Sequence, residues 1–370
     1  MRIDGVHHRT ISPGDDGRSI RLIDQTKLPH ELVFLRVQGL EEAARAISEM
    51  QVRGAPLIGV TAAYGLWLAL LRDPGDASLL SAVETLSATR PTAVNLRWAL
   101  VRMRDLLLPL PEEQRAQAAR AEADRICEED VEINRAIGEH GLPLLKEIHE
   151  KKRPGEPVNV LTHCNAGWLA TVDWGTALSP IYRAHDAGVP VHVWVDETRP
   201  RLQGALTAWE LRSHGVPHTV VVDNAGGHLM QRGMVDICIV GTDRTTADGD
   251  VCNKIGTYLK ALAARESGVP FYAALPSPTI DWSVGDGLRE IPIESRSETE
   301  VTQVLGPLPD GTAGCVSLFP AGTRAENPAF DVTPAALVTG LITDKGLCRA
   351  SREGLLSLFP SGRDEARSGP

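Results

Sequence analysis

The chain has 370 residues, of which 42% are hydrophobic and 23% are charged, a composition typical of a globular protein with two cores. Its formal net charge of −10 disfavours binding to nucleic acid, because nucleic-acid-binding proteins usually carry a basic face. No apolar run reaches the roughly 20 residues that span a bilayer, and the N-terminus lacks the apolar core of a signal peptide. We therefore expect a cytoplasmic protein that does not bind membranes.

Residues 1–152 are predicted to form a mainly helical domain with a small β-sheet. Short β-like runs occupy residues 1–38. From about Gly39 to Lys152, apolar residues recur at three- and four-residue spacing, which indicates amphipathic helices. The segment Lys151 to Asn159 then combines charge with two prolines and a glycine, as linkers do, so we expect the domain boundary after residue 152.

Residues 153–350 are predicted to form a Rossmann-like α/β domain, in which a parallel sheet is covered by helices on both sides. Short apolar runs (VNVL, VPVHVWV, HTVVV, VDICIV, VPFYAAL) alternate there with amphipathic helices. Several runs end in a polar or reactive residue, namely Cys164, Asp196, Asp223 and Asp243. These residues should converge at one sheet edge, where such folds bind ligands. Residues 351–370 lack periodicity and are expected to be a loosely ordered tail.

Cys164 follows the first of these strands, in the segment LTHCNAGWLAT. A helix starting at this point would lower the pKa of the thiol and make it reactive. The alternative is a small buried hydrophobe, which is the commonest fate of a free cysteine. The six cysteines are spread along the chain with no CxxC pair, so we expect reduced intracellular thiols and no metal site.

A second dense group of polar residues lies in GTDRTTADGDVCNKIGTY, from Gly241 to Tyr258. Asp243 ends a strand, and Asn253 and Lys254 are predicted to open a helix. Lysine at a helix N-terminus opposes the helix dipole, a conflict that a bound anion would resolve. The alternative role for Asp243 is that of a turn or capping residue.

A second predicted anion site at a helix start lies in the first domain, in QVRGAPLIGV, where Pro56 suits the first turn of a helix. The backbone N–H groups of Gly54 and Ala55, together with the guanidinium of Arg53, would form a phosphate cradle; the alternative is a loop with a surface arginine. Arg97 lies in an apolar helix, NLRWAL, and would need a phosphate or a carboxylate as partner. No GxGxxG follows the first strand of the second domain and no Walker motif occurs, so nucleotide binding of these two kinds lacks support.

Seven segments together resemble the methylthioribose-1-phosphate isomerases in family order: RGAPLIG, NLRWAL, THCNAGWLAT with GTAL, DETRPRLQGALTAWEL, DNAGG, GTDRTTADGDVCNKIGTY and NPAFDVTP. The resemblance covers nearly the whole chain and ends before the tail. It implies a homodimeric enzyme of methionine salvage that converts 5-methylthioribose 1-phosphate to 5-methylthioribulose 1-phosphate, with neither a metal nor an organic cofactor.

By this resemblance, Cys164 and Asp243 are the catalytic residues. The implied substrate-binding residues are Arg53, Gly54, Ala55, Arg97, Gln203, Asn253 and Lys254. We expect Asp243, with its pKa raised by an apolar surround, to protonate the ring oxygen of the sugar. Cys164 either takes a proton in an enolate route or stabilises charge beside a hydride shift, and the sequence does not choose between these.

Two alternatives remain at this stage. One is an isomerase of a related sugar phosphate, such as 5-deoxyribose 1-phosphate or ribose 1,5-bisphosphate, since only the pocket around C5 would differ. The other is a regulatory subunit of the translation-initiation guanine-nucleotide exchange factor, which shares the fold and binds proteins. The presence of both Cys164 and Asp243 favours an enzyme over that subunit.

Overall fold

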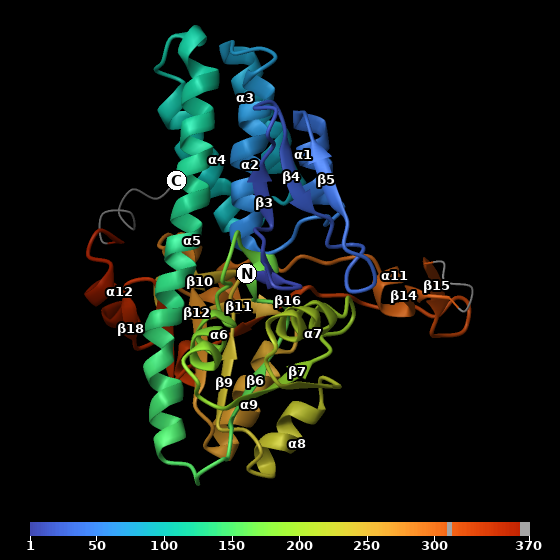
Figure 1. Cartoon of the computed structure of the whole chain (residues 1–370), viewed down its shortest axis with the longest axis vertical. Coiled ribbons are helices and arrows are strands. Elements are labelled where there is room, and N and C mark those ends of the chain that lie inside the picture. The colour runs from blue at the N-terminus through green and yellow to red at the C-terminus, as the bar shows by residue number, and fades with distance from the viewer. Residues whose placement is uncertain (309–312, 363–370) are drawn as a thin grey trace.

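The structure, a computed structural model, describes residues 1–308 and 313–362 and is an α/β protein, as predicted. Helices make up the upper part of the molecule in Figure 1, and the main sheet lies below them. The helices of the upper part are α1 (Leu40–Ser48), α2 (Ala55–Leu70), α3 (Asp76–Thr89), α4 (Val94–Leu107) and the first half of α5 (Glu112–Glu150). A small antiparallel sheet in the order β3-β4-β5 packs beside them: β3 (Ile11–Pro13), β4 (Ile20–Ile23) and β5 (Phe34–Val37).

Helix α2 is the centre of the upper part, and every one of its residues is buried. Its sequence is apolar on all sides, which is expected of a helix surrounded by other elements. Gly54, with φ 98°, precedes the helix, and Pro56 lies in its first turn, as predicted. The amino end of this helix is thereby fixed where the upper part meets the sheet.

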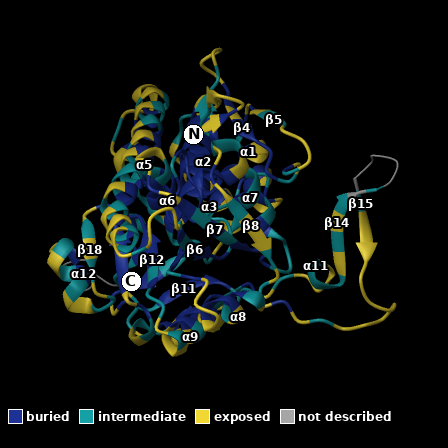
Figure 2. Ribbon diagram, turned by 60° about the horizontal axis from the view of Figure 1, so that its bottom comes forward, coloured by how far each residue is buried: buried dark blue, intermediate teal, exposed yellow. Residues whose placement is uncertain are grey.

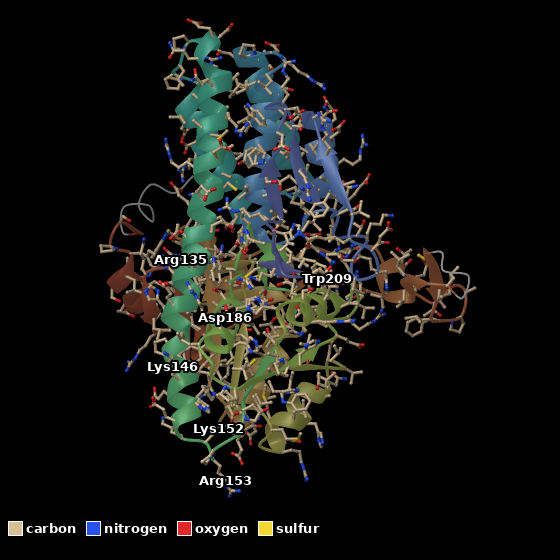
Figure 3. The ribbon with its side chains drawn as sticks, in the orientation of Figure 1. Arg135, Lys146, Lys152, Arg153, Asp186 and Trp209 are labelled. Atoms are coloured by element: carbon tan, nitrogen blue, oxygen red, sulfur yellow. The ribbon has the colours of Figure 1, made fainter. Side chains whose placement is uncertain are left out.

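Helix α5 runs along both parts of the molecule (Figure 1). It has 39 residues, which corresponds to a length of about 58 Å at 1.5 Å per residue. Ala119, Ala123 and Ile126 belong to the apolar cluster of the upper helices. Ile137 and Leu145 belong instead to the cluster beneath the main sheet. Arg135 and Lys146 lie along the outer side of the same helix (Figure 3). The predicted boundary after residue 152 stays a prediction.

The main sheet has, within the described residues, seven strands in the order β18-β17-β12-β9-β6-β7-β8. All neighbouring pairs are parallel except β17 and β18, which confirms the predicted sheet. The strands are β6 (Val158–Thr162), β7 (Val191–Asp196), β8 (His218–Val221), β9 (Ile237–Val240), β12 (Phe271–Leu275), β17 (Gly340–Thr343) and β18 (Gly346–Cys348). The helices between them are α6 (Ser179–Asp186), α7 (Gln203–His214), α8 (Ala225–Gln231) and α9 (Thr257–Ser267).

The strand order reverses direction between β6 and β9. From β6 the chain moves outward to β7 and β8, and it then returns to the other side of β6 as β9. In open α/β sheets, the crevice outside the carboxyl ends of the strands at such a reversal is where ligands bind. Cys164 follows β6 and Asp243 follows β9, so the fold brings both to this crevice.

Smaller elements complete the lower part. A four-stranded sheet in the order β13-β10-β11-β16 contains β10 (Arg244–Thr246), β11 (Val251–Lys254), β13 (Ile280–Asp281) and β16 (Phe330–Thr333). A ribbon of β14 (Gln303–Pro307) and β15 (Ala313–Ser317) stands away from the body (Figures 1 and 2). The remaining elements are β1 (Arg2–Ile3), β2 (Val6–His7), the 3₁₀ turns η1 (Trp168–Ala170), η2 (Ser277–Thr279) and η3 (Ala335–Leu337), and the helices α10 (Gly287–Glu290), α11 (Thr299–Thr302) and α12 (Arg352–Leu358).

Three local predictions were wrong. No α-helix starts at Cys164, because the chain continues through a loop to the 3₁₀ turn at Trp168. Asn253 and Lys254 lie in β11, and the helix begins only at Thr257. The expected loose tail contains α12, which Ser351 caps and Leu355 anchors in the core; residues 363–370 of that tail lie outside the described residues. Within the described ranges, no helix has the length and apolar composition needed to cross a bilayer.

Candidate active site

A cavity lies where the upper helices meet the carboxyl ends of β6 and β9. Its walls come from both parts of the molecule. Eight of the nine predicted site residues line it: Arg53, Gly54, Ala55, Cys164, Gln203, Asp243, Asn253 and Lys254. Residues far apart in the sequence therefore meet at one place.

Arg97 is the exception. It is exposed on α4 and does not line the cavity. Its neighbours Leu96 and Leu100 point into the core, and the helical period places position 97 on the outer side. Arg90 lies instead in the cavity wall, at the carboxyl end of α3. The sequence signal was available, since Arg90 precedes Pro91 in the short turn between two helices.

Cys164 follows β6 in a left-handed backbone conformation, with φ 69°, which is uncommon for a residue with a side chain. Its backbone N–H donates to Thr198 Oγ1 (2.9 Å), and its carbonyl accepts from Thr207 Oγ1 (2.9 Å). Burial raises the pKa of the Cys164 thiol to about 11, although Lys254 and Arg53 pull it down. The thiol is therefore protonated at neutral pH, contrary to the lowered pKa expected from a following helix.

Asp243 follows β9 and faces the same cavity. Desolvation raises the pKa of its carboxyl group, as predicted, while Lys254 and Arg90 lower it and Glu294 raises it further. A carboxylic acid that keeps its proton to a higher pH can donate that proton to a bound molecule. The cavity therefore contains a carboxyl group and a thiol that both have raised pKa values.

The amino end of α2 supplies an anion-binding cradle. A Cβ on Gly54 would lie 2.3 Å from the carbonyl oxygen of Ala170, so only glycine fits there. The Nε of Arg53 is buried and has no hydrogen-bond partner among the described residues. Burial and the nearby charge of Arg201 lower the pKa of Arg53 to about 10. A guanidinium with a buried donor that has no partner among the described residues is suited to an anionic ligand.

Further basic side chains, which sequence reasoning missed, enclose the same space. Arg90, Arg201 and Arg296 line the cavity together with Arg53 and Lys254. The ammonium group of Lys254 lies 4.5 Å from the ring centroid of Phe330. In a chain with a net charge of −10, this concentration of positive charge creates a local field that favours an anion.

Glu210 of α7 holds the loop after Cys164 in place. Its carboxylate accepts hydrogen bonds from the side chains of Asn165 (2.9 Å) and Tyr182 (2.9 Å). It also accepts from the backbone N–H groups of Trp168 (2.8 Å) and Leu169 (3.0 Å). Burial raises the pKa of Glu210 to about 7. Four donors on two oxygens fix the loop that carries the thiol.

His163 connects the strand before Cys164 to the turn after Lys254. Its Nε2 donates to the carbonyl of Ile255 (2.8 Å), and its Nδ1 lies 3.0 Å from Asp196 Oδ2. His163, Asp196 and Asp223 are close enough together to ligate a metal ion. The ammonium group of Lys260 lies 3.1 Å from Asp196, however, and already supplies a positive charge at that point.

Comparison with known proteins gives consistent relatives. A family model described as the initiation factor 2 subunit family matches residues 51–350. Curated methylthioribose-1-phosphate isomerases of Rhodospirillum rubrum and Methylorubrum populi are 62% and 63% identical to this chain over 365 and 367 residues. The alignments cover 97% and 99% of this chain, and 94% and 100% of those proteins.

Solved structures show the same relationship. A 5-methylthioribose 1-phosphate isomerase from Pyrococcus horikoshii OT3 superposes with a TM-score of 0.81 at 40% identity, covering 96% of each chain. The delta subunit of translation initiation factor eIF-2B from A. fulgidus superposes with a TM-score of 0.77 at 38% identity, covering 97% of this chain and 100% of that one.

Proposed function

Because this chain belongs to the initiation factor 2 subunit family, and within it to the methylthioribose-1-phosphate isomerases, we propose that it isomerises 5-methylthioribose 1-phosphate to 5-methylthioribulose 1-phosphate. One observation supports this most directly. Cys164 and Asp243, at the ends of neighbouring strands, line one cavity with a cluster of cations suited to a phosphate. In the proposed set of phosphate-binding residues, Arg90 replaces Arg97.

The raised pKa of Asp243 suits this residue to the first step, the donation of a proton. The anomeric oxygen of the substrate is esterified, so its ring opens only after the ring oxygen is protonated. The protonated carboxyl of Asp243 donates that proton, and the bond between C1 and the ring oxygen breaks. Asp243, now a carboxylate, then accepts the proton of the hydroxyl on C2, which becomes the ketone. Asp243 is thereby protonated again at the end of the cycle.

A hydride shift completes the reaction in this scheme. As the ketone forms, hydrogen moves with its electron pair from C2 to C1. The raised pKa of Cys164, about 11, supports this version, because a protonated thiol is a poor base. Cys164 then acts as a neutral, polarizable group beside the moving hydrogen. We expect product formed in heavy water to carry no deuterium at C1 by NMR; deuterium at C1 would replace this step with proton transfer.

Direct assay tests the function itself. The purified chain should convert 5-methylthioribose 1-phosphate to a ketose faster, by kcat/KM, than 5-deoxyribose 1-phosphate or ribose 1,5-bisphosphate. Comparable turnover of all three would mean a general sugar-phosphate isomerase. No turnover of any, with phosphate bound, would favour a binding protein like the eIF-2B subunit.

Replacement of the two central side chains tests their roles. Asp243→Asn and Cys164→Ser should each lower kcat by several orders of magnitude, because neither step proceeds without its group, while product still binds by calorimetry. Asp248→Asn is the matched control, since Asp248 lies on the same segment and pairs at the surface with Arg352. Near-normal kcat in either of the first two variants would remove that residue from the mechanism.

We also propose that the protein works as a homodimer. Tyr258, Leu259 and Leu262 of α9 expose apolar side chains, and so do Val220 and Val222 at the edge of the main sheet. Lys260 donates a hydrogen bond to the carbonyl of Asp223, which places these two groups next to each other. An exposed apolar surface of this kind supports contact with a second copy.

A further inference from the structure

An alternating series of basic and acidic side chains includes three of the arginines that line the cavity. Arg90 lies 3.5 Å from Glu294, and Glu294 lies 2.6 Å from Arg296. Glu300 lies 2.7 Å from Arg296 and 2.6 Å from Arg201. The series joins the end of α3, the segment that leads into α11, and the turn before α7. All three arginines line the cavity, whereas neither glutamate does.

Glu300 is the most fully bonded member of this series. It accepts from the Nε (3.0 Å) and Nη2 (2.7 Å) of Arg296 and from the Nη1 of Arg201. The side-chain amide of Asn327 donates to it as well (2.9 Å). Burial alone would raise its pKa, but these arginines hold the pKa of Glu300 at about 2. Glu300 is therefore a fixed negative charge behind the cavity wall.

A fixed negative charge offsets the repulsion between the arginines when no anion is bound. Four guanidinium groups and the ammonium of Lys254 line a single cavity, and like charges this close repel each other. Burial lowers the pKa of Arg53, and the nearby charge of Arg201 lowers it further. Arg201 uses only Nη1 in its bond to Glu300, and its other donors have no hydrogen-bond partner among the described residues. The bond thus fixes the side chain while leaving donors for a ligand.

We propose that Glu300 is a positioning residue for the phosphate group: it holds Arg201 and Arg296 against the cavity wall and leaves donors of Arg201 free for the anion. This inference rests on the proposed function for the identity of the anion. A competing role has the opposite consequence. If Glu300 merely occupied the arginines in place of phosphate, its removal would free them and tighten anion binding.

The sign of the change in phosphate affinity separates the two roles. In the full-length protein, Glu300→Gln should raise the Kd for inorganic phosphate about tenfold by calorimetry, because the arginines lose their fixed orientation. KM for the sugar phosphate should rise in parallel, with kcat within about twofold of the original. Glu298→Gln, at an exposed position in the same segment that forms no ion pair with an arginine of the described residues, should leave both values unchanged.

An unchanged or lowered Kd in Glu300→Gln would overturn the proposal, as would a loss of kcat at constant Kd. If Glu300→Gln does not fold, Glu300→Asp keeps the charge but is one methylene too short to reach both arginines. It should weaken phosphate binding as well, and an unchanged Kd would again refute the role. If the original protein turns over no sugar phosphate, but Glu300→Gln still weakens phosphate binding, only the proposed function is contradicted.

Discussion

Asp243 and Lys254 set the pH range in which the acid is available. Desolvation raises the pKa of Asp243 and Lys254 opposes that rise. The protonated form is the active one, so kcat/KM should fall as pH rises through this raised pKa, and this fall should occur above the ordinary aspartate value of 3.8.

Lys254→Gln makes that prediction specific. Removing the opposing cation raises the pKa of Asp243 further, so the falling limb of the kcat/KM profile should move to higher pH even though kcat/KM itself drops. The phosphate of the substrate titrates equally with both proteins, so the displacement belongs to the enzyme. Lys345→Gln, at the exposed end of β17, serves as control. A limb that stays in place would show that another group controls it.

At the scale of single elements, α2 and α4 pack so closely that one methyl group matters. A Cβ on Gly59 would lie 2.8 Å from the carbonyl oxygen of Asn95. Asn95 cannot easily move away, because its side chain accepts a hydrogen bond from Thr279 in the core. Gly59→Ala should therefore lower the free energy of unfolding by about 1–3 kcal/mol in urea denaturation, despite the better helix propensity of alanine.

Gly227 provides the matched control for this substitution. It also lies in a helix, but a Cβ there meets only Ala263 at 3.5 Å, an ordinary contact. Gly227→Ala should leave stability unchanged or raise it by up to about 1 kcal/mol. Equal effects of the two substitutions would mean that the helices separate to accommodate the methyl group.

Element type was predictable from sequence where the apolar period is regular. The strands before Cys164 and Asp243 are continuous apolar runs, and parallel sheets bury such runs on both faces. The placement of Lys254 was harder, because its strand pairs with residues 330–333, far along the chain. The environment of the Cys164 thiol was equally hard to predict, because it depends on a loop that Glu210 holds from a distant part of the chain.

The cluster of arginines shows the same limit. Arg53 was predictable because glycine and proline beside it specify a helix start. Arg97 lies only seven residues beyond Arg90, and the choice between them depends on which side of α4 faces the core. Arg296 reaches the cavity from a segment without regular period. Charge alone therefore identified the ligand type better than it identified the ligand-binding residues.

At the scale of the whole molecule, the proposed dimer predicts that the interface between the two copies lies on the lower part. Leu259 is 60% exposed on α9, in the middle of the apolar surface proposed as the interface. Leu259→Glu should halve the mass seen by light scattering, because a charge at an apolar interface is left without a partner. Leu288→Glu, at a position 68% exposed on α10, should leave the mass unchanged. A monomeric original protein would contradict the dimer outright.

The long helix α5 has a consequence for cooperativity. Its first half packs into one apolar cluster and its second half into the other. Neither half of the molecule can melt without either breaking this helix or stripping apolar side chains from its partner, and both cost free energy. Heating should therefore give one calorimetric transition in place of two, and a fragment cut after residue 152 should aggregate through its uncovered Ile137 and Leu145.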